Sequence, residues 1–185
     1  MARADYVNDV SMQHVLAALT TENRLVMEVA LRTGLRVGDV LALRPQQVRK
    51  GRFTVQEQKT GKSRRVYLPD ELRDRVLKCG NELYCFPHRL NGRKHRTRAA
   101  VWKDLKRAAE AFRLPQNVAT HTARKNWAVR ELEKRGGDVA AVQRELHHTD
   151  PAVTLLYVMA DKLPQTGKRR KKNKCSEGKK DAIAD

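Results

Sequence analysis

The sequence predicts a mainly helical α+β domain with one small β-hairpin, and three observations lead to this prediction. Apolar residues recur every three to four positions over most of the chain, which is the spacing of a buried helix face. One stretch near residue 60 instead favours β-forming residues on both sides of a glycine-containing turn. With 185 residues, the chain has room for one ordinary domain and a tail.

The first helical region is expected over residues 11–33, as two helices in succession. Gly34 should end the second helix, because glycine readily adopts the left-handed conformation found at helix C-termini. A shorter helix is expected over 37–43, ending before Pro45. Arg36 would then lie in a turn between two helices, rigidly placed but with its head group exposed.

The remaining elements follow from changes in the apolar pattern. A β-hairpin is expected with strands over 52–56 and 64–68 and a turn containing Gly61. Residues 84–87 should form an extended connector, and the basic stretch 91–98 a loop. Further helices are expected over residues 70–79, 98–112, 121–135, 138–146 and 151–158. Trp102 and Trp127 are expected to pack in the core or at an interface.

The charge balance predicts a polyanionic partner. Lysine and arginine number 39 against 21 acidic residues, which gives a formal net charge of +18. Such an excess favours nucleic acid, since neutralised phosphates release condensed counterions, with an acidic membrane surface as the competing interpretation. No apolar run is long enough to span a bilayer, and the first residues do not resemble a signal peptide. A soluble, cytoplasmic, DNA-associated protein with no membrane partner is therefore expected.

The cysteines and histidines give no pattern that is typical of a metal site. Cys79 and Cys85 are too far apart for a C-x-x-C pair, and Cys175 lies in the polar tail. His88 and His95 lie near Cys85, but their spacing matches no standard set of ligands. We therefore predict no metal.

Four short motifs carry residues that can handle a phosphodiester. Arg36 lies in the segment Thr-Gly-Leu-Arg-Val-Gly-Asp, and His121 and Arg124 have the spacing H-x-x-R. His148 follows a leucine and a histidine, and Tyr157 stands nine residues later. Two arginines can bind the oxygens of one phosphate, histidine can transfer protons, and a tyrosine hydroxyl can attack phosphorus. Together they indicate an enzyme that breaks and rejoins DNA through a phosphotyrosine bond.

Over residues 15–160 these motifs resemble the tyrosine recombinases, also called phage integrases, in their catalytic domain. The resemblance implies that Asp39 supports Arg36, and that Lys59 is the lysine of the family's hairpin, with Lys62 as its rival. His147 departs from the pattern, because the family usually has glycine at this position. His147 is accordingly a second possible imidazole in the site.

The resemblance also implies the roles of these residues. Arg36 and Arg124 would stabilise the charge that develops on the phosphoryl oxygens, and Tyr157 would be the nucleophile. His121 would take the tyrosine proton, while His148 would bind the phosphate or orient the site. Lys59 would protonate the departing 5′ oxygen. The intermediate would be a 3′-phosphotyrosine ester, and neither ATP nor any other cofactor would be required.

Double-stranded DNA is the expected partner. The predicted contacts are basic residues of the hairpin, the loop, the H-x-x-R helix and the tail: Lys62, Arg64, Arg93, Lys94, Arg96, Lys125, Lys168, Arg169 and Arg170. The resemblance implies a tetramer on DNA, possible accessory DNA-binding proteins and a monomer when free. Two other interpretations stay open: a catalytically silent DNA-binding module of the same fold, and a DNA relaxer similar to type IB topoisomerases.

The expected organisation is a lead over 1–14, a catalytic domain over 15–163 and a basic tail over 164–185 that is disordered alone. Members of the family usually carry a separate N-terminal domain that closes a clamp around DNA. The sequence leaves open whether the chain is an excised catalytic domain or a naturally short protein. The expected reaction serves integration, excision or resolution of a mobile element.

Overall fold

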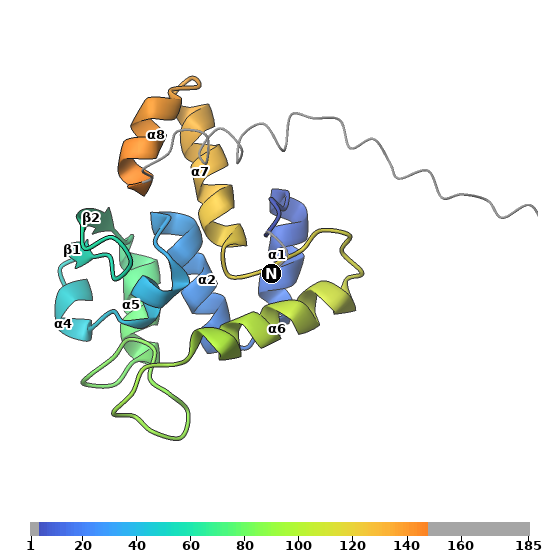
Figure 1. The fold of residues 1–185 in the computed structure, drawn as a ribbon. Helices are drawn as coiled ribbons and strands as arrows, with labels where there is room; N and C mark the ends of the chain where they lie inside the picture. Colours follow the sequence, from blue (N-terminus) through green and yellow to red (C-terminus); the bar gives the residue numbers. More distant parts are fainter. Residues whose placement is uncertain (1–3, 148–185) are drawn as a thin grey trace, which may run out of the picture.

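The computed structural model, which describes residues 4–147, is mainly helical, with one small hairpin at its side next to the short helix Pro45–Val48 (Figure 1). Over these residues the elements are, in chain order, α1 (Asp9–Ala18), α2 (Thr21–Thr33), α3 (Val37–Leu41), α4 (Pro45–Val48), β1 (Arg52–Gln56), β2 (Ser63–Tyr67), α5 (Asp70–Cys79), α6 (Arg98–Ala111), α7 (Thr122–Lys134) and α8 (Val139–Leu146). Helix and hairpin content matches the α+β prediction.

Helix α2 is the centre of the packing, since it contacts α1, α3, α5, α6 and α7. Its apolar residues recur at helical spacing and are buried, among them Val26, Val29 and Ala30, each with no exposed surface. The helix ends at Gly34, which adopts the left-handed conformation with φ 67° and donates its N–H to the carbonyl of Ala30. The chain therefore leaves α2 in a fixed direction, and this direction sets the position of Arg36.

The hairpin is antiparallel, and its register pairs Arg52 with Tyr67 and Gln56 with Ser63. Side chains alternate between the two faces, and Val55 and Val66 point into the core. Glu57 closes the turn with two backbone hydrogen bonds: its N–H donates to the carbonyl of Lys62 at 2.9 Å, and its carbonyl accepts from Gly61 at 2.8 Å. The turn after β1 is thus firmly attached at its base.

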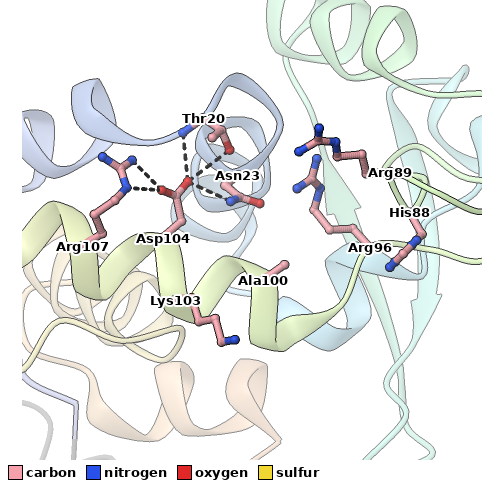
Figure 2. A pocket seen from close by; sticks show the side chains of 9 residues that line it. All are labelled: Thr20, Asn23, His88, Arg89, Arg96, Ala100, Lys103, Asp104 and Arg107. Carbon is pink, nitrogen blue, oxygen red and sulfur yellow. Dashed lines mark hydrogen bonds and ion pairs between the residues drawn. The ribbon is translucent and has the colours of Figure 1, made fainter.

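A buried carboxylate joins the start of α2 to α6. Asp104 accepts hydrogen bonds from the backbone and hydroxyl of Thr20, from the amide of Asn23 and from Arg107 (Figure 2). Burial raises the pKa of this carboxyl, but the donors outweigh that effect, so the pKa lies below its usual range. The same residues line one side of a cavity of about 420 Å³, and Arg89 and Arg96 lie on its other side.

Most predicted boundaries agree with the structure to within two residues. Helix α5 occupies the predicted range, whereas α1 begins at Asp9, where Asn8 caps it by accepting a hydrogen bond from the Ser11 N–H. The short helix α4 was not predicted, and Pro45 is its first residue. The predicted helix over 151–158 lies outside the described residues.

The two tryptophans differ in burial. Trp127 is buried on α7, whereas Trp102 is 45% exposed on α6, where Lys106 lies over its ring. Trp127 therefore packs in the core as predicted, whereas Trp102 does not, and an interface role for Trp102 stays a prediction. Each helix within residues 4–147 is too short or too polar to span a bilayer. The same residues contain no cluster of three or more histidine, cysteine or acidic side chains suited to hold a metal ion.

Candidate active site

Arg36 is placed by the turn between α2 and α3. It is the N-cap residue of α3 and follows Leu35, whose side chain is fully buried. The guanidinium remains partly exposed, and its Nη1 donates to the Oε2 of Glu57 at 2.6 Å. Arg36 lies in a turn between two helices as predicted, but its side chain is only 17% exposed rather than fully exposed.

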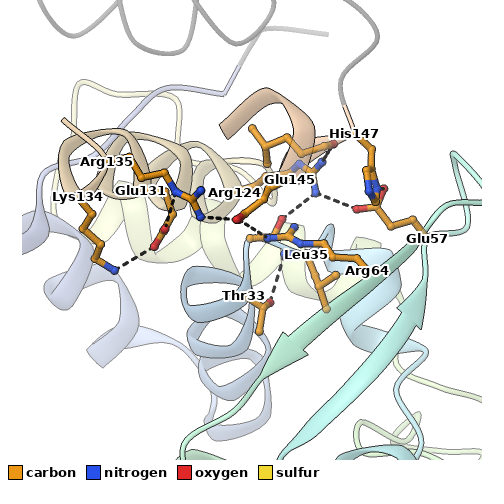
Figure 3. A network of polar contacts seen from close by, with 12 residues as sticks. Thr33, Leu35, Glu57, Arg64, Arg124, Glu131, Lys134, Arg135, Glu145 and His147 are labelled. Carbon is orange, nitrogen blue, oxygen red and sulfur yellow. Dashed lines mark hydrogen bonds and ion pairs between the residues drawn. The ribbon is translucent and has the colours of Figure 1, made fainter. Parts of the chain in front are cut away.

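Arg124 reaches the same place from α7. Its Nη1 donates to the carbonyl of Gly34 and its Nη2 to the carbonyl of Leu146, both at 2.7 Å (Figure 3). These two carbonyls lie at the C-terminal ends of α2 and α8, where helix dipoles favour a cation. Arg124 is only 3% exposed, so three helices share one buried guanidinium.

The two guanidinium groups converge on Glu57. Besides its bond with Arg36, Glu57 places its Oε1 3.6 Å from Nη1 of Arg124, and it has no exposed surface. Burial raises the pKa of this carboxyl, but hydrogen bonds from Arg36 and Thr60 and the charge of Arg124 outweigh it. The pKa therefore lies below its usual range, and Glu57 is ionised at neutral pH. The structure brings the two predicted arginines together around one anion.

Glu57 was missed by the sequence prediction, although a signal was present. It follows β1 and stands two residues after Val55, so the alternation of the strand continues inward to Glu57. A carboxylate on the buried face of a strand needs a cationic partner. The spacing thus points to a buried ion pair.

His121 is the N-cap residue of α7 and lies within electrostatic reach of the arginines. Partial loss of hydration lowers its pKa first, and the positive charges of Arg124, Arg36, Arg98 and Lys59 lower it further. A lowered pKa leaves the imidazole neutral at neutral pH. In this form the ring can accept a proton.

Asp39 binds the hairpin turn that carries Lys59. Lys59 is exposed in the turn after β1, and its neighbour Gln58 donates its backbone N–H to Oδ1 of Asp39 at 3.0 Å. Asp39 is 3% exposed on α3. Burial raises the pKa of its carboxyl above the usual range, although the bond from Gln58 opposes the shift. Asp39 thus attaches the turn to α3, the helix that Arg36 caps.

His147 reaches the site from the end of α8. Its backbone is left-handed, with φ 50°, a conformation that glycine adopts more readily than other residues. Its Nδ1 lies 3.4 Å from Oε2 of Glu57 (Figure 3). The predicted site residues His148 and Tyr157 lie outside the described residues.

Two of the predicted DNA-contact residues are buried. Arg64 is 8% exposed, with its guanidinium 4.6 Å from the centre of the Trp127 ring and 4.0 Å from Glu145. Loss of hydration lowers the pKa of Arg64, which reflects this enclosure. Lys125 is 4% exposed on α7. Burial of these two side chains argues against a direct contact with DNA, and the contacts themselves stay predictions.

The other predicted DNA-contact residues differ in how exposed they are. Lys62 in the hairpin turn, and Arg93 and Lys94 in the loop before α6, are exposed. Arg96 is 14% exposed and lies 3.4 Å from Glu22, so an acidic side chain already offsets its charge. The predicted tail contacts Lys168, Arg169 and Arg170 lie outside the described residues.

The sequence is similar to curated integrases and tyrosine recombinases. A probable integrase/recombinase, YoeC of Bacillus subtilis, is 29% identical over 136 residues, covering 71% of this chain and 74% of that protein. The tyrosine recombinase XerD of Lacticaseibacillus casei is 31% identical over 153 residues, covering 75% of this chain and 50% of XerD. The integrase of Escherichia phage P2 is 28% identical over 152 residues, covering 82% and 42%. The chain thus spans half or less of the length of the last two relatives.

Solved structures show the same fold. A lambda integrase dimer bound to a COC′ core site matches with a TM-score of 0.67 and 22% identity, covering 85% of this chain and 49% of that one. The catalytic domain of bacteriophage HP1 integrase matches with a TM-score of 0.59 and 21% identity, covering 85% and 88%. The model of the phage integrase family matches residues 6–163. The resemblance drawn from the motifs is confirmed, and the chain belongs to the phage integrase family.

Proposed function

We propose that the protein is a site-specific DNA recombinase that cleaves and rejoins DNA through a 3′-phosphotyrosine intermediate. The observation that carries this proposal is the convergence of Arg36 and Arg124 on one buried anion. Two guanidinium groups held at one point can stabilise the charge that develops on a phosphoryl group, a contribution of several kcal/mol in a preorganised site. Membership of the phage integrase family supports the same reaction.

The proposed reaction assigns each proton. The hydroxyl of Tyr157 attacks the scissile phosphorus while the bond to the 5′ oxygen breaks, and His121 takes the phenolic proton. Lys59 gives a proton to the departing 5′ oxygen. Religation reverses both proton transfers and restores the phosphodiester bond, so the reaction needs no external source of energy. The lowered pKa of His121 supports its role, because a neutral imidazole is needed to accept the proton.

His148, Asp39 and His147 complete the proposed site. His148 would hydrogen-bond the scissile phosphate or orient the other groups. The bond from Gln58 to Asp39 supports a positioning role for this carboxylate rather than a chemical one. The contact of His147 with Glu57 supports its place at the edge of the site.

Double-stranded DNA is the proposed substrate, in integration or excision of a mobile element. The formal charge of +18 supports DNA binding, and related folds have been solved on DNA, including the lambda integrase dimer. We propose a monomer in solution and a higher-order assembly, a tetramer, on DNA. Accessory DNA-binding proteins are part of this proposal.

Covalent trapping on DNA tests the proposed function. A pool of nicked duplexes with a randomised core is incubated with the protein, and complexes that resist denaturing detergent are isolated. Cleavage releases the short fragment between the cut and the nick, which carries the free 5′ hydroxyl. This fragment diffuses away, so cleavage becomes irreversible. We expect an adduct whose peptide map places the DNA on Tyr157, and no adduct from Tyr157→Phe.

The alternatives predict different results in this experiment. A DNA-binding module of the same fold would retain duplexes from the pool without forming an adduct. A relaxer would form adducts with no enrichment of any sequence, and would relax supercoiled plasmids that lack a selected site. Either result would contradict site-specific recombination.

A matched pair of variants separates DNA contacts from buried charges. Lys62→Met is expected to reduce the salt dependence of DNA binding by about one unit of slope, because one exposed phosphate contact is lost. Arg64→Met should leave the slope unchanged and lower the free energy of unfolding by about 1–2 kcal/mol, since the contact with Trp127 is lost. Binding to a mixed-sequence duplex as a function of salt, with thermal unfolding, measures both. Equal slopes for Lys62→Met and the wild type would contradict the contact.

A further inference from the structure

Glu57 does more than form an ion pair with Arg36, because its carboxylate also lies close to other side chains of the candidate site. Its Oε2 accepts hydrogen bonds from Arg36 at 2.6 Å and from the hydroxyl of Thr60 at 2.9 Å. The same oxygen lies 3.4 Å from Nδ1 of His147, and Oε1 lies 3.6 Å from Arg124. The carboxylate is entirely buried, so its charge is balanced by these side chains rather than by bulk water.

These contacts come from four separate segments. Arg36 is the N-cap residue of α3, and Thr60 lies in the hairpin turn. Arg124 lies in the first turn of α7, and His147 follows α8 (Figure 3). The helical segments pack mainly on α2 or on one another, whereas the hairpin turn extends from the strands. A single carboxylate therefore ties the turn to the three helical segments that carry the site.

The turn held in this way carries Lys59. Glu57 begins the turn, and its backbone bonds with Lys62 and Gly61 close it. Thr60 then returns to the carboxylate of Glu57, so the side chain and the backbone of one residue hold both ends of the turn. Lys59 lies between these attachment points. Its exposed side chain can reach outward, while its backbone has a fixed position relative to Arg36.

The charge of Glu57 has two opposing effects on the proposed reaction. It fixes the direction of two guanidinium groups, which would otherwise repel each other at short range. It also places a negative charge next to the position of an incoming phosphate, and this charge weakens the binding of DNA. Removal of the Glu57 charge should therefore lower the rate of cleavage and raise the affinity for DNA.

We propose that Glu57 is a positioning residue, which holds Arg36, Arg124 and the Lys59 turn in the arrangement needed for DNA cleavage. This inference rests on the proposed function. Misplacement of reacting groups by about 1 Å can lower a rate by about 100-fold. Loss of the Glu57 charge is therefore expected to lower the rate of cleavage on bound DNA by about that factor.

The test compares Glu57→Gln and Glu57→Asp with a matched control, Glu28→Gln. Glu28 also pairs with two arginines, Arg24 at 2.7 Å and Arg75 at 2.8 Å, but it lies on α2 outside the site. Single-turnover cleavage is measured at saturating amounts of the nicked duplex selected by the wild-type protein. Affinity for the same duplex is measured separately.

For Glu57→Gln we expect cleavage about 100-fold slower than in the wild type, with DNA bound equally or more tightly. Glu57→Asp should recover part of the rate, because it keeps the charge on a shorter side chain. Glu28→Gln should cleave at the wild-type rate. The proposal is overturned if Glu57→Gln cleaves within twofold of the wild type, or if its rate and affinity fall together in proportion to the folded fraction.

A second measurement needs no DNA and separates this inference from the proposed function. The side-chain Nε signals of Arg36 and Arg124 are followed by ¹H–¹⁵N NMR in the free protein. We expect sharp signals in the wild type and Glu28→Gln, and broadened or shifted signals in Glu57→Gln. Unchanged signals would overturn the positioning role. A third outcome is possible, in which Glu57→Gln changes the signals but the wild-type protein forms no DNA adduct. This outcome would refute the proposed reaction and leave the positioning of the arginines by Glu57 intact.

Discussion

Replacement of Arg36 by alanine is expected to slow DNA cleavage by about 100- to 1,000-fold, the usual effect of removing one preorganised donor from a developing anion. The physical reason is the loss of one of two guanidinium groups that converge at Glu57. Arg36 is the more exposed of the two and thus the one that an incoming phosphate can reach directly. Single-turnover cleavage of the selected nicked duplex measures the effect.

The stability of this variant must be measured together with its activity. Arg36→Ala leaves the fully buried Glu57 with its nearer cation removed, and breaking a buried ion pair on one side costs about 3–5 kcal/mol. The low pKa of Glu57 implies that its ionised form stabilises the fold above its usual pKa, and that this contribution is lost as the pH falls through the lowered value. Rates are therefore compared per folded molecule.

Two further variants separate charge from geometry at Arg36. Arg36→Lys keeps the positive charge but lacks the planar fork of donors, so it should recover stability to a greater extent than cleavage. Arg32→Ala removes the same charge from an exposed position on α2 and should cleave at the wild-type rate. A cleavage rate of Arg36→Ala within tenfold of the wild type, per folded molecule, would contradict the assignment of Arg36 to the reaction.

The fold could be predicted from the sequence where a local residue sets an element. Gly34 ends α2 as predicted, and the β-forming stretches pair around Gly61. Near Pro45 the prediction is incomplete, since proline there does not merely follow a helix but begins α4. Proline suits the first position of a helix, because the N–H that it lacks would have no partner there. A four-residue helix has too few positions to show periodicity.

The site could be predicted only in part, because charge was taken as a sign of exposure. Arg64 shares a face of β2 with Val66, and both are buried, so strand alternation was the better guide. The same alternation places Glu57 on the inner side after Val55. Arg36 and Arg124 were identified from motif spacing, whereas the carboxylate between them depends on the packing of α3 and α7 against the hairpin. Such a tertiary contact is not visible in any single segment.

Gly34→Ala is expected to lower the free energy of unfolding by about 2–5 kcal/mol, because backbone conformation and packing both oppose a side chain at this turn. Gly34 has φ 67°, and an alanine in the left-handed region costs about 1–2 kcal/mol. The added Cβ would also lie 2.4 Å from Cδ2 of Trp127, well inside van der Waals contact. Overpacking of this kind costs a further 1–3 kcal/mol or so, and thermal or denaturant unfolding measures the sum.

Gly136→Ala separates the two causes, because Gly136 has a similar φ of 61° but no atom within 4 Å of the position of an added Cβ. This variant should lose only the 1–2 kcal/mol or so that the backbone conformation costs. The difference between the two variants then measures the clash with Trp127. The clash also bears on the site, since the carbonyl of Gly34 accepts the hydrogen bond that orients Arg124. Gly34→Ala should therefore slow cleavage per folded molecule, and equal unfolding free energies for the two variants would contradict the close packing of Trp127 on this turn.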